Sequence, residues 1–309
     1  MQRRARIHYA ISGSAGTGYP LRVTLSVVII SHNEETNIGR TLASVRPLVA
    51  DGKGEVIVVD SGSTDRTVEI AKSHGAKVFL ETWKGYAAQK NSAIDKASGD
   101  WILSLDADEE LDGQLVEEIS WLMRAIPIWQ KDGMPVGSDP ESRELRDRGT
   151  KIGLDEEDLN GFFIPRKNHF LHRWIRHGGF WPDPKLRLFR RGSGKFQDQA
   201  VHETMKVSGV TSSVQQGAIL HHSYPTLSDY IAHMNRYSSL GAEMVVARGP
   251  VHFAAFNIVL RPAATFIYNY FFRLGFLDGR EGLLLHLHHA VYVSWKYAKA
   301  WELAQQRGT

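Results

Sequence analysis

Cysteine is absent from the 309-residue sequence. This excludes disulfides, thiolate catalysis and cysteine-ligated zinc or iron–sulfur centres, and it is compatible with a reducing compartment. The sequence also lacks an uninterrupted apolar run long enough to cross a bilayer. Residues 1–20 lack the apolar stretch that a secretory signal requires. We therefore expect a disordered leader over residues 1–23 and no membrane-spanning helix.

Net charge is also small, because 37 lysines and arginines are offset by 34 aspartates and glutamates, which leaves a formal charge of +3. Such a balance gives no reason to expect nucleic acid as a partner. The basic residues gather after Arg166, which suits an anionic substrate or an anionic membrane surface. The chain is long enough for one α/β domain with a helical appendage.

Apolar strands alternate with helical segments in the first half of the chain. The expected strands are 25–31, 55–60, 77–81 and 101–106, and the expected helices are 35–45, 63–74, 85–97 and 112–125. Strands that are apolar throughout and separated by helices indicate a parallel sheet covered on both faces. Ligands of such sheets bind beyond the carboxyl ends of the strands, where Asn33, Asp60 and Asp106 fall.

The second half of the chain is less regular. Residues 127–160 are polar and charged, and we expect an insertion or loop there with one short helix near 141–148. Further strands are expected at 161–166, 185–190 and 217–221, followed by helices from Leu227 onward with breaks at Gly249-Pro250 and near Asp278-Gly279.

Two carboxylates follow the fourth strand, in Asp106-Ala107-Asp108. A pair placed in this way can hold a hard divalent cation and leave positions open for phosphate oxygens. Such a cation would neutralise the charge that builds on a departing diphosphate. Acidic residues at this position can also simply cap the next helix. The place of the pair behind a buried strand favours the metal site.

Asp60 ends the second strand and is followed by Ser61, Gly62 and Ser63. Its carboxylate can accept hydrogen bonds from a base or ribose, and the turn lets backbone N–H groups approach a ligand. A helix-capping role alone explains Ser63 and Asp65 but leaves Asp60 without a function.

Other polar residues fall near the same sheet edge. Ser31, Asn33 and Glu34 follow the first strand and offer hydrogen-bond donors and acceptors. Lys90 lies on the third expected helix, where it could reach a phosphate or belong to a solvated face.

These segments resemble a known family. VVIISHNEETNIGRTLASV, EVIVVDSGSTDRTVEIAKSHGAKV and KNSAIDKASGDWILSLDADEEL together look like the family 2 glycosyltransferases of the GT-A fold. GGFWPDPKLRLFRR, FQDQAVHE and RLGFLDGREG resemble the bacterial lipopolysaccharide-core glycosyltransferases. The resemblance covers residues 24–303 apart from the polar segment. It implies an α/β, Rossmann-like, mostly parallel sheet with helices on both faces, with a catalytic domain at 24–225 and a C-terminal amphipathic helical extension at 226–309.

The resemblance also implies a role for each matched position. Asn33 and Glu34 would line the nucleotide site, and Asp60 would contact the base. Asp106 and Asp108 would bind Mg²⁺ or Mn²⁺, with phosphate oxygens completing the coordination.

Inverting transfer needs a base that deprotonates the acceptor hydroxyl. Glu203 is the first candidate and Asp198 the second, although Glu203 could instead pair with an arginine near residues 187–191. The sequence departs here from family members whose base lies in a Glu-Asp pair, because no such pair follows Asp108 in the expected region. His221, at the end of a late strand, could be a further metal ligand or a buried, hydrogen-bonded histidine.

The segment around Trp181 combines glycines with aromatic surface that can stack on sugar rings. The candidate acceptor-binding residues are Trp181, Asp183, Lys185 and Arg187, with the basic side chains suited to phosphate on a glycolipid core. The alternative is a β-hairpin with exposed charges. Aromatic and basic residues continue through 253–301, a composition typical of helices that lie in the membrane interface, although core packing would also use them.

The expected function is therefore metal-dependent, inverting transfer of a sugar from a UDP-sugar to a hydroxyl of the lipopolysaccharide inner core, with glucose implied by the resemblance. We expect a cytoplasmic enzyme, peripheral on the inner face of the cytoplasmic membrane. The alternatives are transfer to a polyprenyl-phosphate carrier or capsular glycan, and a non-catalytic nucleotide-sugar-binding scaffold. A Rossmann dehydrogenase is disfavoured because no G-x-G-x-x-G follows the first strand.

Overall fold

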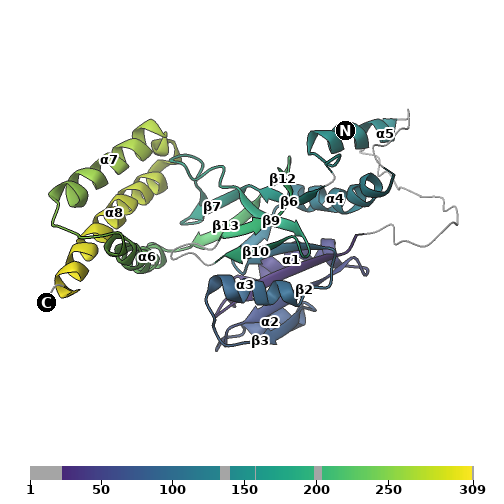
Figure 1. Cartoon of the computed structure of the whole chain (residues 1–309), viewed down its shortest axis with the longest axis horizontal. Coiled ribbons are helices and arrows are strands. Elements are labelled where there is room, and N and C mark those ends of the chain that lie inside the picture. The colour runs from purple at the N-terminus through teal and green to yellow at the C-terminus, as the bar shows by residue number, and fades with distance from the viewer. Residues whose placement is uncertain (1–22, 133–139, 157, 198–203, 308–309) are drawn as a thin grey trace.

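A seven-stranded, mostly parallel sheet forms the centre of the molecule (Figure 1). The computed structural model describes residues 23–132, 140–156, 158–197 and 204–307. The strands lie in the order β12 (Val210–Ser213), β6 (Leu159–Ile164), β9 (Lys185–Arg190), β4 (Trp101–Asp106), β1 (Leu25–Ser31), β2 (Gly54–Asp60) and β3 (Lys77–Leu80). Only β9 runs antiparallel to its neighbours among these strands.

Helices cover both faces of this sheet, as the apolar strands predicted. Val27 and Ile29 of β1 pack in one core with helices α1 (Ile38–Val49), α2 (Thr67–Ser73) and α4 (Gly113–Asp132). Val28 packs in a second core with α3 (Tyr86–Asp95) and with the hairpin of β10 (Gly194–Gln197) and β11 (Thr204–Val207). Alternate side chains of one strand therefore serve two cores, which is why the strand is hydrophobic throughout.

A second, four-stranded sheet lies beside the carboxyl end of β4. Its order is β5 (Glu109–Leu111), β13 (Ile219–Tyr224), β7 (Arg166–Phe170) and β8 (Arg173–Trp174). The register places His221 opposite Glu109 on one side and Asn168 on the other. Residues more than 50 positions apart in the chain are thus brought to the acidic segment.

The polar segment 127–160 is more helical than expected. Helix α4 continues past Ala125 and through Pro127 because Ile126 and Trp129 are buried in the core. Helix α5 (Pro140–Lys151) includes the predicted short helix and packs so closely on α4 that a Cβ at Gly149 would lie 2.5 Å from the Trp129 ring. Core packing outweighs the cost of an internal proline here.

The chain from Leu227 onward forms a helical extension at one end of the molecule (Figure 1). Helices α6 (Leu227–Ala247) and α8 (Gly279–Arg307) pack along each other. Between them lie η1 (Phe256–Leu260), α7 (Arg261–Ile267), η2 (Tyr268–Phe272) and η3 (Gly275–Asp278). The predicted breaks at Gly249-Pro250 and before α8 are both present. Among the described residues, no helix is both long and apolar enough to cross a membrane.

Candidate active site

Asp106, at the carboxyl end of β4, is held between two cationic side chains. Its Oδ1 lies 2.7 Å from Lys90 Nζ, and its Oδ2 lies 2.6 Å from Arg187 Nη2. Burial would raise the pKa of Asp106, but Arg187 and Lys90 outweigh it and hold that pKa well below its ordinary value. Asp106 is therefore an ionised carboxylate with both oxygens paired.

The two cations are buried rather than solvated. Lys90 projects from α3 to Asp106, so the alternative of an exposed surface lysine is wrong. Arg187 lies on β9, between β4 and β6, and also contacts Glu109 Oε1 at 2.7 Å. A hairpin with exposed charges is therefore wrong for Arg187, because this strand is internal to the sheet. Arg187 faces the acidic segment and not an open acceptor surface.

Asp108 faces His221 across the junction of the two sheets. Asp108 Oδ2 lies 3.3 Å from His221 Nε2. Burial raises the pKa of Asp108, and the Asp106 carboxylate adds to this, but His221 outweighs both and the pKa is lowered. The structure thus brings together two side chains that the sequence placed 113 positions apart.

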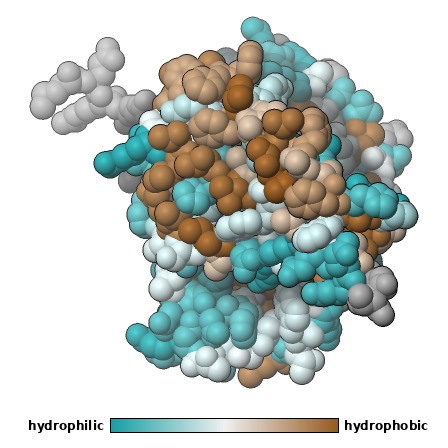
Figure 2. Space-filling model, turned by 90° about the vertical axis from the view of Figure 1, so that its left-hand side faces the viewer, coloured by the Kyte–Doolittle hydropathy of each residue, from teal (hydrophilic) through white to brown (hydrophobic). Residues whose placement is uncertain are grey.

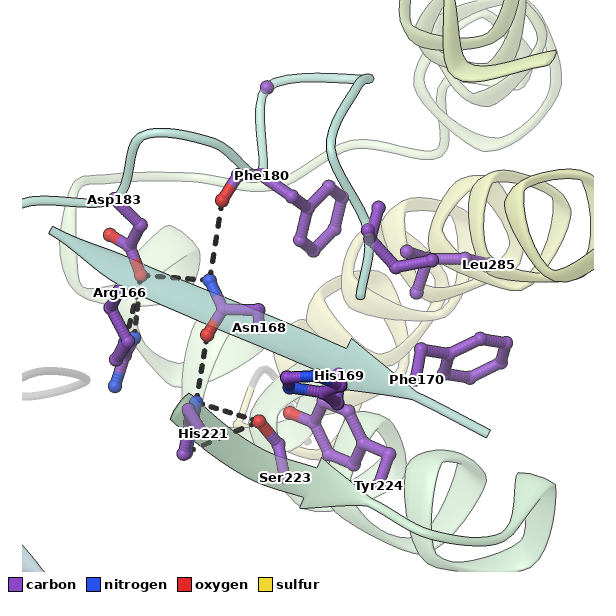
Figure 3. A pocket seen from close by; sticks show the side chains of 12 residues that line it. Arg166, Asn168, His169, Phe170, Phe180, Asp183, His221, Ser223, Tyr224 and Leu285 are labelled. Atoms are coloured by element: carbon purple, nitrogen blue, oxygen red, sulfur yellow. Dashed lines mark hydrogen bonds and ion pairs between the residues drawn. The ribbon is translucent and has the colours of Figure 1, made fainter. Parts of the chain in front are cut away.

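Asn168 fixes the orientation of the His221 ring (Figure 3). The Asn168 side-chain NH₂ donates to Asp183 Oδ2 at 3.0 Å and to the Phe180 carbonyl at 3.4 Å, so its oxygen faces His221 Nδ1 at 2.8 Å. We assign the proton to Nδ1 from the orientation of the Asn168 amide, with Ser223 Oγ, 2.7 Å from the same nitrogen, as a second acceptor. Nε2 consequently points at the Asp108 carboxylate.

Asp108 and His221 are the described side chains that could hold a divalent cation between them. A lone pair on Nε2 facing a carboxylate is stable only with a proton or a cation between them, and both groups are ligands of Mn²⁺ or Mg²⁺. A metal-bound histidine ordinarily donates its other N–H to a fixed acceptor, and the Asn168 oxygen, 2.8 Å from Nδ1, is placed to be that acceptor. Among the described residues, no three His, Cys, Asp or Glu side chains are grouped to hold a metal. Ligand oxygens would therefore complete the coordination.

Arg166 links the acidic segment to the loop that carries Asp183. Its guanidinium contacts Glu109 Oε1 at 3.1 Å and Asp183 Oδ2 at 2.7 Å. Burial would raise the pKa of Asp183, but Arg166, Asn168 and Lys185 lower it to about 2. Asp183 therefore remains charged and holds both Arg166 and Asn168. Arg166, Glu109 and Asn168 were not predicted as site residues, since each acts through partners that are distant in sequence.

A cavity of about 280 Å³ begins beside His221 and extends to the helical extension (Figure 3). Polar side chains line the part near the acidic segment: Arg166, Asn168, Asp183, His221 and Ser223. Apolar and aromatic side chains line the rest: Phe170, Ile175, Phe180, Tyr224 and Leu285. The combination can bind a sugar by hydrogen bonds on one side and ring stacking on the other.

The first two strands end at the same edge as β4, as predicted. Ser31 pairs with Asp60 in the register, and Ile30 pairs with Asp106. Asn33, with φ +55°, accepts a hydrogen bond from Thr64 N at 2.8 Å and joins the two loops. These residues therefore surround one end of the sheet.

Asp60 is enclosed by the loop that follows β2. Its side chain has an exposed fraction of 0% and accepts hydrogen bonds from Ser31 Oγ, Gly62 N, Ser63 N and Ser63 Oγ. Four internal donors surround it because the loop folds over the carboxylate. In this structure Asp60 shapes the loop, and its contact with a base stays a prediction. Ser61 Oγ, in contrast, is buried with no hydrogen-bond partner among the described residues.

Glu34 lies within the electrostatic field of the acidic pair. Burial raises its pKa, Asn37 lowers it through a hydrogen bond, and the charges of Asp108 and Asp106 raise it further. The net shift is upward. Glu34 therefore takes up a proton at a higher pH than an isolated glutamate, as expected beside two carboxylates.

The remaining candidates are two acceptor-binding residues, which the structure describes, and the two candidate bases, which it does not. The Trp181 ring meets Trp174 edge to face at 5.2 Å, and Lys185 Nζ pairs with Asp183 at 2.9 Å. Asp198 and Glu203 lie outside the residues that the structure describes, so their assignment as the base stays a prediction.

The loop that carries Asp183 is attached to the helical extension. The buried Asp278 accepts hydrogen bonds from Arg176 N at 3.2 Å and from His177 N at 2.8 Å, and Gly178 N donates to Arg273 O at 2.9 Å. A Cβ at Gly178 would lie 2.0 Å from the His286 ring, so only glycine fits there. The motifs GGFWPDPKLRLFRR and RLGFLDGREG are thus in direct contact.

Relatives of the chain fall among the glycosyltransferases. It is 26% identical over 287 residues to the lipopolysaccharide core biosynthesis glycosyltransferase LpsC of Rhizobium meliloti, which covers 91% of this chain and 93% of the relative. It is 50% identical over 98 residues to an uncharacterized glycosyltransferase of Rickettsia bellii, and it spans only 32% of that relative's length.

A weaker likeness links the chain to a solved structure. Glucosyl-3-phosphoglycerate synthase from Mycobacterium tuberculosis, in complex with Mn²⁺, UDP and glucosyl-3-phosphoglycerate, matches with 28% identity. The match covers 36% of this chain and 44% of the synthase, with a TM-score of 0.28, which is too low to carry an argument.

The model of the family described as glycosyl transferase family 2 matches residues 26–179. This segment begins in β1 and includes the acidic pair, Arg166 and Asn168. The mostly parallel sheet, covered by helices on both faces and followed by a helical C-terminal region, is a GT-A-like fold. Residues 26–179 therefore form a family 2 glycosyltransferase domain.

Proposed function

We propose that this glycosyltransferase transfers a hexose, with inversion, from a UDP-sugar to a hydroxyl of the lipopolysaccharide inner core, with the help of Mg²⁺ or Mn²⁺. The observation that carries the proposal is the Asp108–His221 pair, with 3.3 Å between Oδ2 and Nε2. The pair lies between the strand ends that form the nucleotide edge and the cavity that fits a sugar.

Asp108 and His221 would hold the cation. When bound, the cation supplies Lewis-acid stabilisation of the negative charge on the departing diphosphate. Asp106 was expected as a second ligand, but both of its oxygens are paired here. We assign it instead to anchoring Lys90 and Arg187, whose positive charges then lie close to the position of the diphosphate.

The nucleotide would occupy the edge formed by Ser31, Asn33, Glu34 and Ser61. Three of these residues lie in the loops that follow β1 and β2, and the Ser61 hydroxyl has no partner among the described residues. The choice of a uridine nucleotide rests on the sequence resemblance to family 2 enzymes, and that of glucose on the resemblance to the lipopolysaccharide-core glycosyltransferases.

The acceptor sugar would bind in the cavity beside His221. Asn168, Asp183 and Ser223 offer polar contacts there, and Phe170 and Phe180 offer apolar surface. The lipopolysaccharide core is proposed as the acceptor because the match to the lipopolysaccharide core biosynthesis glycosyltransferase LpsC extends over 93% of that relative's length.

Glu203 would act as the base, with Asp198 as the second candidate. Both belong to the chain between β10 and β11, and Phe196 of β10 lies 5.1 Å from Lys90 Nζ. The described ends of this segment are therefore close to the proposed diphosphate site. A carboxylate there can take the proton of the acceptor hydroxyl without competing for the cation.

A lipopolysaccharide precursor is anchored by lipid, so we place the enzyme at a membrane surface. We place it on the cytoplasmic side, where it would bind its UDP-sugar donor. A polyprenyl-phosphate or capsular acceptor would be separated from this proposal by direct transfer assays with each acceptor.

Asp108→Asn tests the proposal, with the exposed Asp95→Asn on α3 as the matched control. UDP-glucose at about 100 times its Kd should stabilise the wild type by about 2.7 kcal/mol, or about 4 °C in Tm, only when Mn²⁺ or Mg²⁺ is present. The control should behave like the wild type, and Asp108→Asn should lose the metal-dependent shift and turnover. A full shift and full turnover in Asp108→Asn would refute the metal assignment. Metal-dependent binding without any transfer or hydrolysis would instead support the scaffold alternative.

A further inference from the structure

Large apolar side chains are exposed over one face of the helical extension. Phe256 has an exposed fraction of 59% and Phe272 one of 74%. We call the exposed large apolar side chains of residues 253–277 the apolar face. Figure 2 shows apolar side chains gathered over this end of the molecule, with hydrophilic residues below them. Soluble monomers rarely expose such a continuous patch unless it binds something.

These residues do not serve the core. All five residues of η1 and all five of η2 are described, and none of them is buried. The core of the extension is formed instead by α6 and α8, through residues such as Ala242 and Leu285. Core packing, the alternative reading of this composition, therefore does not account for η1 and η2.

The charge of this segment has only one sign. Residues 244–277 contain three arginines, Arg248, Arg261 and Arg273, and no aspartate or glutamate. All three arginines are exposed. A two-fold pairing with a second copy would bring the same arginines toward one another, which opposes association. Anionic lipid headgroups complement both the arginines and the apolar side chains.

We propose that the apolar face inserts into the interface of a membrane that contains anionic lipid. The aromatic side chains of η1 and η2 enter the acyl boundary, and the arginines lie at the level of the lipid phosphates. The segment lies in the membrane plane, consistent with the absence of a spanning helix among the described residues. The inference deepens the proposed function, because it names the surface that approaches the lipid of the acceptor.

The location of the cavity fits this orientation. Leu285 of α8 lines the cavity, and the loop carrying Asp183 is hydrogen-bonded to Asp278 and to the Arg273 carbonyl. Docking of the extension would thus hold the acceptor cavity near the membrane surface, where a lipid-anchored sugar can enter it.

Co-sedimentation with lipid vesicles tests the inference on the full chain. The vesicles are phosphatidylcholine alone, or phosphatidylcholine mixed with phosphatidylglycerol. The variant is Phe272→Asp, alone and combined with Phe256→Asp. The matched control is Val210→Asp, which places the same charge at an apolar residue 39% exposed on the edge strand β12.

The wild type and Val210→Asp should bind the mixed vesicles. Their affinity for the neutral vesicles should be lower, by about fivefold for each arginine that reaches the headgroups. Phe272→Asp should weaken binding by about tenfold, and the double variant by more. Equal Tm values for Phe272→Asp and Val210→Asp establish that the variant is folded. High salt should weaken binding to the mixed vesicles.

Two results would overturn the inference. One is a wild type that ignores both vesicle types, and the other is a double variant that binds as tightly as Val210→Asp. Sedimentation velocity that shows a dimer abolished by Phe272→Asp, without vesicle binding, would assign the face to a second copy. UDP-glucose hydrolysis, measured without vesicles, reports on the proposed function separately. Vesicle binding without hydrolysis would support the membrane inference and count against the proposed function. Hydrolysis without vesicle binding would support the proposed function and overturn the membrane inference.

Discussion

Replacing Arg187 with leucine removes the cation that joins Asp106 to Glu109. Arg187 Nη2 lies 2.6 Å from Asp106 and 2.7 Å from Glu109, and the Glu109 side chain is fully buried. After the substitution, Asp106 keeps Lys90 at 2.7 Å and Glu109 keeps Arg166 at 3.1 Å. Each carboxylate thus loses one of its two cations.

The expected loss of stability follows from these contacts. Removing one partner of a buried ion pair costs about 3–5 kcal/mol, and the surviving cations place Arg187→Leu at the lower end, at about 3 kcal/mol. The entropy of unfolding is about 2.1 cal/mol/K per residue, or about 0.65 kcal/mol/K for this chain. The Tm should therefore fall by about 5 °C.

Differential scanning calorimetry at about pH 7 measures this change. The matched control is Arg190→Leu, an exposed arginine on the same strand, which should alter the free energy of unfolding by less than about 0.5 kcal/mol. If Arg187→Leu melts within about 1 °C of Arg190→Leu, the buried network does not stabilise the fold in the way described.

The same variant has an expected pH signature. The pKa of Asp106 in the folded wild type lies well below its ordinary value of 3.8, with burial opposing and Arg187 and Lys90 favouring the charged form. The stability that this carboxylate contributes is present above pH 3.8 and is lost as the pH falls toward the lower folded value. Without Arg187 the folded pKa rises, so acid unfolding of the variant should begin at a higher pH than that of the wild type.

Three further changes test other parts of the molecule. Glu203→Gln should lower kcat by about 10²–10⁴-fold and preserve the metal-dependent Tm shift with UDP-glucose, and an unchanged kcat would exclude Glu203 as the base. Asp278→Ala leaves the N–H groups of Arg176 and His177 without their acceptor, so calorimetry should show a loss of about 3 kcal/mol; a change below about 0.5 kcal/mol would contradict the attachment of the loop. Burial lowers the pKa of His286 from 6.5 to about 4, so wild-type stability should fall as the pH drops between these values. His286→Leu should flatten that dependence, and parallel Tm curves for the two proteins would refute it.

The pattern of apolar residues predicted the sheet well. β9 was predicted with its observed bounds, and the first four strands differ from expectation by one residue at most. A continuous apolar run in an α/β protein reports local burial on both faces, so the sequence suffices to find it. The end of α4 was wrong, because burial of Trp129 decides whether the helix continues beyond Pro127, and that burial depends on α5.

The candidate site also has a part that the sequence predicted and a part that it could not predict. The strand ends of β1, β2 and β4 could be placed at one edge, because parallel strands of a sheet end together. The pairing of Lys90 with Asp106, and the enclosure of Asp60 by its own loop, could not be read from residue type. A charged residue near a strand end has the same sequence signature whether it meets a ligand, solvent or a buried partner.

The sequence by itself determined the strands of the first half and their class of fold, the acidic pair after β4, and the basic and aromatic character of the extension. Only the tertiary structure decided that Asp108 meets His221, that Asn168 orients that histidine, and which apolar residues of the extension remain exposed. Local patterns report how each segment is buried, because that burial repeats with the period of a helix or strand. Contacts between distant segments depend on how those segments pack, and single side chains at the ends of β4, β7 and β13 carry no periodic signal of their partners.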